Sequence, residues 1–203
     1  MHQCVVISAG VEGPVDEAVA RRLIAHVGGS PGAVYGKEGK QALCKRIHGY
    51  NHAARHAPWL VLVDLNGDAD CAPPLRQAWL PNLAPRMCFR IAVRQVEAWL
   101  MADREALAKY LSIAPSRIPA APESLQNAKV EMVNLARQSR HKDVRADMVP
   151  RHGSGRAVGP AYTSRLIEFV NNHWRPDKAA RNADSLRRAI NCLQQLVRKT
   201  TSP

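Results

Sequence analysis

The sequence of 203 residues lacks the features of several specialised protein classes. No apolar run approaches the roughly 20 residues that a membrane-spanning helix needs, so we expect no transmembrane segment. Met1-His2-Gln3 opens neither a basic stretch nor an apolar one, which predicts no signal peptide. The five cysteines are odd in number, and no pair has C-x-x-C spacing. Their pattern argues against a disulfide framework or a zinc ribbon and predicts a protein of the reducing cytoplasm.

Aromatic residues are scarce, at 5% of the chain. Hydrophobic residues make up 46% and charged residues 23%, close to the average of soluble globular proteins, which excludes wholesale disorder. A chain of this length buries about 70% of the surface that it exposes when unfolded. We therefore expect one domain of ordinary size or one domain with a helical appendage.

Positive charge is in excess and unevenly distributed. The formal net charge is +12, from 29 Lys and Arg against 17 Asp and Glu. Residues 1–115 carry 13 basic and 10 acidic side chains, whereas residues 116–203 carry 16 and 7. A basic second half favours a polyanion as partner, nucleic acid first, and a basic surface kept for solubility is the alternative.

Strands and helices alternate in the first half of the sequence. Short apolar, β-branched runs predict strands over residues 3–9, 33–36, 59–63 and 87–93. Helical spacing of apolar residues predicts helices over residues 15–27, 39–56, 75–80 and 95–112, the last with a break at Asp103. This alternation indicates a mainly parallel sheet flanked by helices, an α/β domain over residues 1–113.

No strand is predicted after residue 115. Three prolines, at 115, 119 and 122, form a linker, and helices are expected over residues 123–138, 160–174 and 184–198. Residues 139–159 are basic and rich in glycine, which predicts a loop. We therefore expect residues 114–203 to form a basic α-helical region packed on the first domain.

Acidic residues follow three of the predicted strands: Glu12, Asp64 and Glu97. Asp68 and Asp70 lie in the loop behind Asp64. Because the carboxyl ends of parallel strands meet at one edge of a sheet, these carboxylates are expected to converge, and a divalent cation would relieve their repulsion. The sequence thus predicts a site for Mg²⁺ or Mn²⁺, suited to phosphodiester cleavage. Helix capping and ordinary turn chemistry explain the same residues without a metal.

Short motifs along nearly the whole chain carry a family resemblance. Val11-Glu12-Gly13-Pro14-Val15-Asp16 resembles the first motif of TOPRIM domains, and Val63-Asp64-Leu65-Asn66-Gly67-Asp68 resembles the second, usually Asp-x-Asp. The wider pattern is similar to a family of small prokaryotic TOPRIM-like proteins, domain of unknown function 4276, related to OLD-family nucleases. Its further matching stretches are Gly36-Lys37-Glu38-Gly39-Lys40, Asp70-Cys71, residues 92–100, Asn127-Ala128-Lys129, residues 158–162 and residues 183–186.

The resemblance implies a TOPRIM-like fold and roles for the acidic residues. Glu12 would be a metal ligand or a general acid or base, Asp64 a Mg²⁺ ligand, and Glu97 an extra acidic ligand of the OLD type. Asn66 stands where the second aspartate is usual, which weakens the metal site unless Asp68 or Asp70 substitutes. The resemblance also implies a role in antiphage defence, with an ABC-type or SMC-like ATPase as partner.

Basic residues complete the predicted site. The Gly36–Lys40 stretch offers two lysines and backbone N–H groups at a helix start, although Gln41 breaks the Walker spacing. Residues 137–156 hold six Lys or Arg against two Asp and no aromatic residue, which favours sequence-tolerant contacts to a nucleic-acid backbone over base stacking. The residues expected to contact phosphate or nucleic acid are Lys37, Lys40, Arg94, Lys129, Arg140, Lys142, Arg145, Arg151 and Arg156. Each group also has an explanation without a ligand: the Gly36–Lys40 stretch could simply begin a helix, Arg94 could form an ion pair, and residues 137–156 could be a solvated loop.

We therefore expect an enzyme, a metal-dependent TOPRIM-type nuclease that hydrolyses phosphodiesters of DNA or RNA. The catalytic residues would be Glu12, Asp64 and Glu97, and the metal ligands Glu12, Asp64, Asp68 and Asp70. The alternative is a degenerate TOPRIM-like protein that binds nucleic acid or a partner ATPase without cleaving. A third hypothesis is a phosphatase or nucleotide-handling enzyme that uses the same metal edge.

Overall fold

The computed structural model describes residues 4–67 and 71–201, so that Asp68 and Asp70 lie outside the described residues. Packing divides the chain into two compact units. The first unit comprises Met1–Val93 together with Ser185–Pro203, and the second unit comprises Arg94–Asp184. This division differs from the predicted boundary at residue 113 in two ways: residues 94–113 belong to the second unit, and the last helix belongs to the first.

The first unit is built on a sheet of four parallel strands, as the alternating pattern predicted. The strands are β1 (Val6–Val11), β2 (Ser30–Gly36), β3 (Trp59–Asp64) and β4 (Met87–Ala92), in the order β2-β1-β3-β4. All six residues of β3 are buried, which explains its uninterrupted apolar sequence. The two central strands, β1 and β3, pair in parallel, so their carboxyl ends lie side by side.

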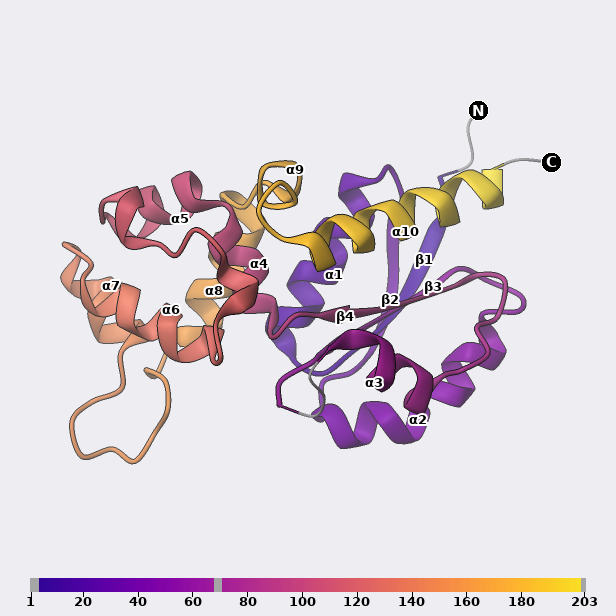
Figure 1. Cartoon of the computed structure of the whole chain (residues 1–203), viewed down its shortest axis with the longest axis horizontal. Helices are drawn as coiled ribbons and strands as arrows, with labels where there is room; N and C mark the ends of the chain where they lie inside the picture. The colour runs from indigo at the N-terminus through magenta and orange to yellow at the C-terminus, as the bar shows by residue number, and fades with distance from the viewer. Residues whose placement is uncertain (1–3, 68–70, 202–203) are drawn as a thin grey trace. The chain divides into compact units, whose positions relative to one another are not determined.

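Helices cover both faces of this sheet. On one face, α2 (Lys40–Ala53) and α3 (Ala72–Trp79) pack on a core formed with β3 and β4, to which Met87, Phe89 and Ile91 contribute. On the opposite face lie α1 (Pro14–His26) and α10 (Asp184–Thr201) (Figure 1). The N-terminus of α10 is fixed in the first unit, where the Val93 backbone N–H donates to Ser185 Oγ at 3.2 Å.

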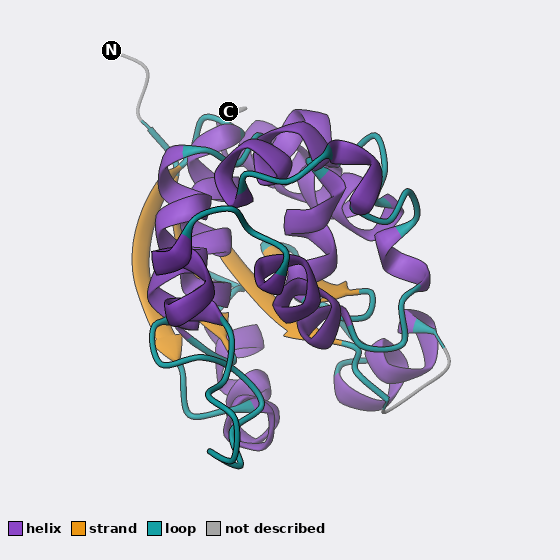
Figure 2. Cartoon of the chain, turned by 90° about the vertical axis from the view of Figure 1, so that its left-hand side faces the viewer, coloured by secondary structure: helices purple, strands orange, loops and turns teal. Residues whose placement is uncertain are grey.

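The second unit is helical in its described residues (Figure 2). Its helices are α4 (Val96–Ala102), α5 (Arg104–Leu111), α6 (Ala128–Arg137), α7 (Lys142–Met148), α8 (Tyr162–Asn172) and α9 (Pro176–Ala179), with 3-10 turns at Pro115–Arg117 and Pro122–Ser124. Every residue of α4 is buried, and α4 packs against α5, α6 and α9. Trp99 and Trp174 are fully buried and joined by a hydrogen bond from Trp174 Nε1 to the Trp99 carbonyl, at 3.2 Å.

Two local predictions need correction in this unit. The segment expected to be a loop over residues 139–159 contains α7, a helix of seven residues whose buried Val144 and Met148 are one turn apart. Two apolar residues one turn apart are too few to identify a helix from sequence spacing. The helix expected from residue 123 begins at Ala128 instead, because the Asn127 side chain caps it by accepting from the Val130 N–H at 3.0 Å.

None of the helices over residues 4–67 and 71–201 combines the length and the apolar character that crossing a membrane requires.

Asp103 both interrupts the predicted helix and anchors α9. Its carboxylate is 2% exposed, caps α5, and accepts two guanidinium hydrogen bonds from Arg175, at 2.6 and 3.0 Å, as well as the Arg175 backbone N–H. We expect Asp103→Ala to lower the free energy of unfolding by about 2 kcal/mol, because it removes a cap and a buried charged acceptor. Chemical denaturation would measure the change.

Glu105 provides the matched control, because its carboxylate contacts the same guanidinium at 3.1 Å but is 80% exposed. We expect Glu105→Ala to cost less than about 0.5 kcal/mol. Equal losses in the two variants would contradict the role of buried Asp103.

Candidate functional site

The structure brings Glu12 and Asp64 together at the carboxyl edge of the sheet. Glu12 follows β1 directly and Asp64 ends β3, the neighbouring strand. Glu12 Oε1 accepts a hydrogen bond from the Asp64 backbone N–H at 2.7 Å. Asp64 is 8% exposed and Glu12 is half-buried. Two carboxylates that are far apart in the sequence thus share one partly buried edge, which is where sites of parallel sheets usually lie.

The turn that follows β2 is fastened to this edge. The Lys37 N–H donates to the Val11 carbonyl and the Gly39 N–H to the Glu12 carbonyl, both at 3.0 Å. Gly36 has φ of +95°, and a Cβ at this position would collide with the Val11 carbonyl oxygen. Only glycine allows so close an approach, so the turn holds the backbone of residues 11 and 12 in place.

Lys40, the first residue of α2, brings a positive charge to the same edge. Its ammonium group donates to the Asp64 carbonyl and, at 3.3 Å, to the Leu65 carbonyl. It also lies 5.8 Å from the centre of the Trp79 ring. Lys40 therefore holds the chain where it leaves β3, next to the Asp64 carboxylate.

Lys37, the other lysine of this turn, pairs with Glu17 on α1 at 3.1 Å. Partial burial would raise the pKa of Glu17, but hydrogen bonds from Lys37 and Arg21 outweigh it and lower that pKa. Both lysines predicted to bind phosphate thus have protein partners, and contact with phosphate stays a prediction for each.

Glu12 and Asp64 are the described residues of this edge that could hold magnesium. Mg²⁺ is commonly held by one or two carboxylates, with water and phosphate oxygens completing its shell. Glu12 and Asp64 supply two carboxylates at one edge, and Asn66, which adopts a left-handed φ of 52°, lies two residues further on. The predicted ligands Asp68 and Asp70 fall outside the described residues. Among residues 4–67 and 71–201, no group of three or more His, Cys, Asp or Glu side chains is gathered as a metal site.

Glu97 lies in the second unit, in the first turn of α4. Its carboxylate is almost fully buried: Oε1 accepts from the Tyr162 hydroxyl at 3.2 Å and lies 3.7 Å from Lys129 Nζ, while buried Oε2 has no hydrogen-bond partner. Lys129 is fixed by its backbone N–H, which donates to Gln95 Oε1 at 2.9 Å. The role of Glu97 in a site with Glu12 and Asp64 stays a prediction, and no residue pattern beyond the family resemblance pointed to Tyr162.

The two acidic residues of the basic segment, residues 137–156, form ion pairs within the second unit. Arg165 on α8 pairs with Asp143 and Asp147 at 2.8 Å each and with Glu168 at 3.2 Å. Asp143 and Asp147 are the two acids that lower the charge of residues 137–156 in the sequence, and Arg165 lies outside that window. Sequence reasoning missed this arginine because its partners are 18 and 22 residues away.

The predicted nucleic-acid contacts of this unit differ in their availability. Arg140, Lys142, Arg151 and Arg156 are exposed and, in the described part of the chain, form no ion pair. Arg145 is half-buried and donates to the Ser139 carbonyl, so it braces the start of α7. Arg94 is half-buried at the beginning of the unit. Of the predicted contacts in this unit, the first four residues are therefore the accessible ones.

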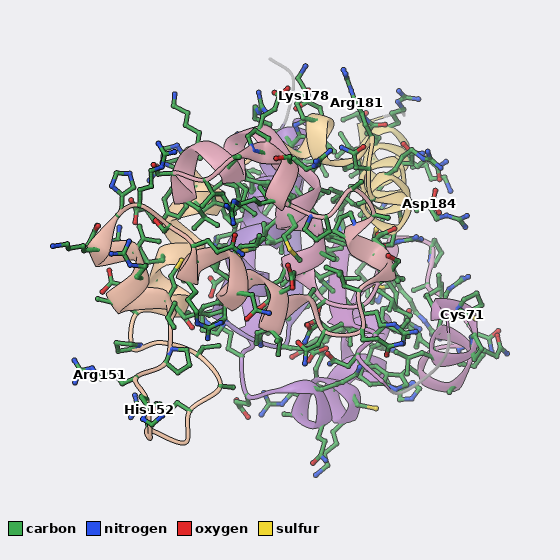
Figure 3. All side chains as sticks on the ribbon, turned by 60° about the vertical axis from the view of Figure 1, so that its left-hand side comes forward. Cys71, Arg151, His152, Lys178, Arg181 and Asp184 are labelled. Atoms are coloured by element: carbon green, nitrogen blue, oxygen red, sulfur yellow. The ribbon has the colours of Figure 1, made fainter. Side chains whose placement is uncertain are left out.

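Two of these four residues, Arg151 and Arg156, lie on the loop between α7 and α8, residues 149–161, which we call the basic loop. Its ends are closed by hydrogen bonds from the Gly159 N–H to the Met148 carbonyl, at 3.0 Å, and from the Ala161 N–H to the Asp147 carbonyl, at 2.9 Å. Figure 3 shows Arg151 and His152 on the outer part of the loop, away from the helices. A cavity of about 420 Å³ is lined by Arg151, Ser154, Arg156, Val158 and Pro160. The basic loop thus presents two arginines from a fixed base.

In comparisons with known proteins, no family model, no curated protein and no solved structure matches this sequence.

Proposed function

We propose that this chain is a metal-dependent nuclease of TOPRIM type, which hydrolyses phosphodiester bonds of DNA or RNA. The observation that supports the proposal best is the hydrogen bond from the Asp64 backbone N–H to Glu12 Oε1, which joins the two motif residues at the carboxyl edge of the sheet. The resemblance of the segments around Glu12 and Asp64 to the two TOPRIM motifs gives these carboxylates their expected chemistry.

Three residues of the first unit would prepare the reaction. The Asp64 N–H orients the Glu12 carboxylate, so that Glu12 can hold an attacking water and accept its proton. The backbone at Asp64 is held in place by the Lys40 ammonium group, which donates to the carbonyls of residues 64 and 65. Burial of Asp64 limits access of bulk water and strengthens its interaction with a cation.

Glu12 and Asp64 would hold Mg²⁺ or Mn²⁺, with substrate phosphate oxygens and water as the other ligands. When bound, such an ion neutralises charge on the scissile phosphate and acidifies a coordinated water.

The exposed cations of the second unit favour a polymeric substrate over a small phosphate ester. Arg140, Lys142, Arg151 and Arg156 would neutralise backbone phosphates, a contribution to binding that is independent of sequence. No aromatic residue lies among residues 137–156, so stacking on bases would add little there. A partner ATPase and a role in antiphage defence belong to the proposal through the family resemblance alone.

The proposal is tested by incubating the purified chain with Mg²⁺ or Mn²⁺ and supercoiled DNA, single-stranded DNA or tRNA. We expect cleavage of at least one of these polymers, and complete loss of cleavage when EDTA removes the metal. Cleavage that persists in EDTA would contradict a metal mechanism, and turnover of small phosphate esters without cleavage of any polymer would favour the phosphatase hypothesis.

One observation favours the alternative of a protein that binds without cleaving. Lys40 already places an ammonium group at the Asp64 backbone, and Asn66 replaces the usual second aspartate with a neutral side chain. A lysine can stabilise an acidic edge without a metal. Salt-sensitive binding of nucleic acid, with no cleavage in either metal and no calorimetric signal for Mg²⁺ or Mn²⁺ binding, would establish this alternative.

A further inference from the structure

A cavity of about 550 Å³ lies in the second unit, between α5 and the chain that runs from the end of α8 to the start of α9. It is lined by Glu105, Ala106, Lys109, Tyr110, Asn172, His173 and Arg175. Its volume falls in the range of about 300–1,000 Å³ that is typical of sites for small molecules. All the lining residues belong to one compact unit, and none is part of the proposed nuclease site, so the cavity is a separate candidate site.

Two aromatic rings form part of the cavity wall. The Tyr110 and His173 ring centres are 5.3 Å apart, and the Tyr110 ring is also 5.3 Å from that of buried Phe169. The Tyr110 hydroxyl donates to the Arg165 carbonyl at 3.0 Å and to the Glu168 carboxylate at 3.1 Å, so this ring is fixed at both ends. His173 is exposed beside it. The cavity therefore has a preformed aromatic wall, on which a planar ring can stack.

The Arg175 guanidinium group in the cavity wall is held in one orientation by two acids. Its Nε and Nη2 donate to Asp103 at 3.0 and 2.6 Å, and Nη2 also donates to Glu105 at 3.1 Å. In the described part of the chain, its third nitrogen, Nη1, makes no hydrogen bond. A guanidinium group whose other nitrogens are fixed loses little freedom when it binds a further anion. Arg175 is thus prepared to donate to a ligand through Nη1.

Lys109 supplies a positive charge that no acid of the described chain compensates. It is exposed on α5, one turn after Glu105, and among residues 4–67 and 71–201 it forms no ion pair. Glu105, the acid among the lining residues, is already bound to Arg175. The Asn172 amide and the His173 imidazole add further hydrogen-bond donors to the wall. These groups favour an anionic ligand with several acceptor oxygens, such as a phosphate group.

We propose that this cavity binds a nucleoside monophosphate, whose phosphate contacts Lys109 and Arg175 and whose base stacks on His173. Inorganic phosphate would leave the aromatic wall unused, and a nucleoside would leave the charge of Lys109 unpaired. The nucleotide is either free or the phosphorylated end of a nucleic-acid strand, because both present a base next to a terminal phosphate. The proposal is independent of the nuclease function, since binding at the cavity needs neither Glu12 nor Asp64.

The test measures binding to the full chain by calorimetry, in EDTA so that no metal-dependent cleavage interferes. The probes are AMP, adenosine and inorganic phosphate, together with a short single-stranded oligonucleotide that carries a phosphate at its 5′ end, at its 3′ end or at neither. If the ligand is a free nucleotide, we expect AMP to bind at least about tenfold more tightly than adenosine or phosphate, because it uses both parts of the wall. If the ligand is a strand end, we expect the same advantage for a phosphorylated oligonucleotide over the unphosphorylated one.

Variants at exposed positions assign the two parts of the ligand. Lys109→Gln should weaken binding of the phosphorylated probe about tenfold, because it removes a charged donor to the phosphate. His173→Ala should weaken the same probe about fivefold, because it removes a stacking surface, and should leave the affinity for inorganic phosphate within about twofold. The control is Lys178→Gln, which removes the same charge from an exposed lysine on α9 that does not line the cavity and should change the affinity by less than about twofold.

Thermal unfolding of each variant establishes that it is folded. Equal losses in Lys109→Gln and Lys178→Gln would overturn the proposal, because net charge alone would then explain the binding. It would also be overturned if neither AMP nor a phosphorylated oligonucleotide bound more tightly than its unphosphorylated counterpart. Because no cleavage is measured, a negative result here leaves the nuclease proposal untouched, and a chain that does not cleave can still bind the nucleotide.

Discussion

Replacing Glu12 by glutamine is expected to lower the rate of metal-dependent cleavage by about 100-fold or more, because a carboxylate that holds a metal and accepts a proton contributes that much. Glutamine keeps an oxygen that can accept the hydrogen bond from the Asp64 N–H, so the fold of the edge should survive. The substitution therefore removes the charge and the basicity while it keeps the shape. Cleavage of the best polymer substrate, measured under single-turnover conditions, gives the ratio of rates.

Glu38 provides the matched control for this variant. It lies in the same unit, in the turn before α2, and its carboxylate forms an exposed ion pair with Arg46 at 2.8 Å. We expect Glu38→Gln to change the rate by less than a factor of about two, since exposed ion pairs contribute little. If Glu12→Gln also cleaves at the wild-type rate, the edge carboxylates are not the catalytic site. A Tm within a few degrees of wild type, measured for each variant, excludes unfolding as the cause of a loss.

Removing two cations of the basic loop is expected to weaken binding of nucleic acid about tenfold at low salt. Arg151→Gln combined with Arg156→Gln takes away two exposed guanidinium groups that form no ion pair in the described part of the chain. If each neutralises one backbone phosphate, the slope of log K against log salt becomes shallower by about 1.8 for duplex DNA. Fluorescence anisotropy over a series of salt concentrations measures both quantities.

The control removes the same charge elsewhere in the second unit. Lys178 in α9 and Arg181 just after it are exposed and lie away from the basic loop (Figure 3). We expect Lys178→Gln combined with Arg181→Gln to change the affinity by less than about twofold. Equal losses in the two double variants would mean that net charge alone attracts the polyanion, and the basic loop would then have no special role.

Part of the geometry of the acidic edge could be predicted from the sequence. Glu12 and Asp64 could be placed at one edge because each follows a strand with an unmistakable apolar pattern, and parallel strands put their carboxyl ends together. The contacts of Lys40, which lies at the same edge, could not be predicted in this way. The Gly36–Lys40 stretch suggested a phosphate loop, whereas the structure uses Lys40 to hold the carbonyls of Asp64 and Leu65. A lysine side chain reaches many partners, and its sequence neighbours do not fix which one it finds.

The exposed charge of residues 137–156 in the second unit also could not be predicted from local composition. Counting residues 137–156 gave six cations and two acids, but Arg165, which lies beyond that window, occupies both acids. The exposed positive charge of the segment is therefore set by a partner that local composition cannot reveal. Asp103 is similar: its place as a helix cap follows from the sequence, and its bond to Arg175 does not.

The α/β class, the four strands and most helices could be predicted from the amino-acid sequence, because those features follow from the local period of apolar residues. The sequence also determined which acidic residues follow the strands. Two features depend on tertiary contacts that the sequence pattern did not predict: α10 belongs to the first unit, and Arg165 pairs with Asp143 and Asp147. These contacts join residues far apart in the chain, and their free energy depends on packing and on the order of strands, which no local pattern encodes.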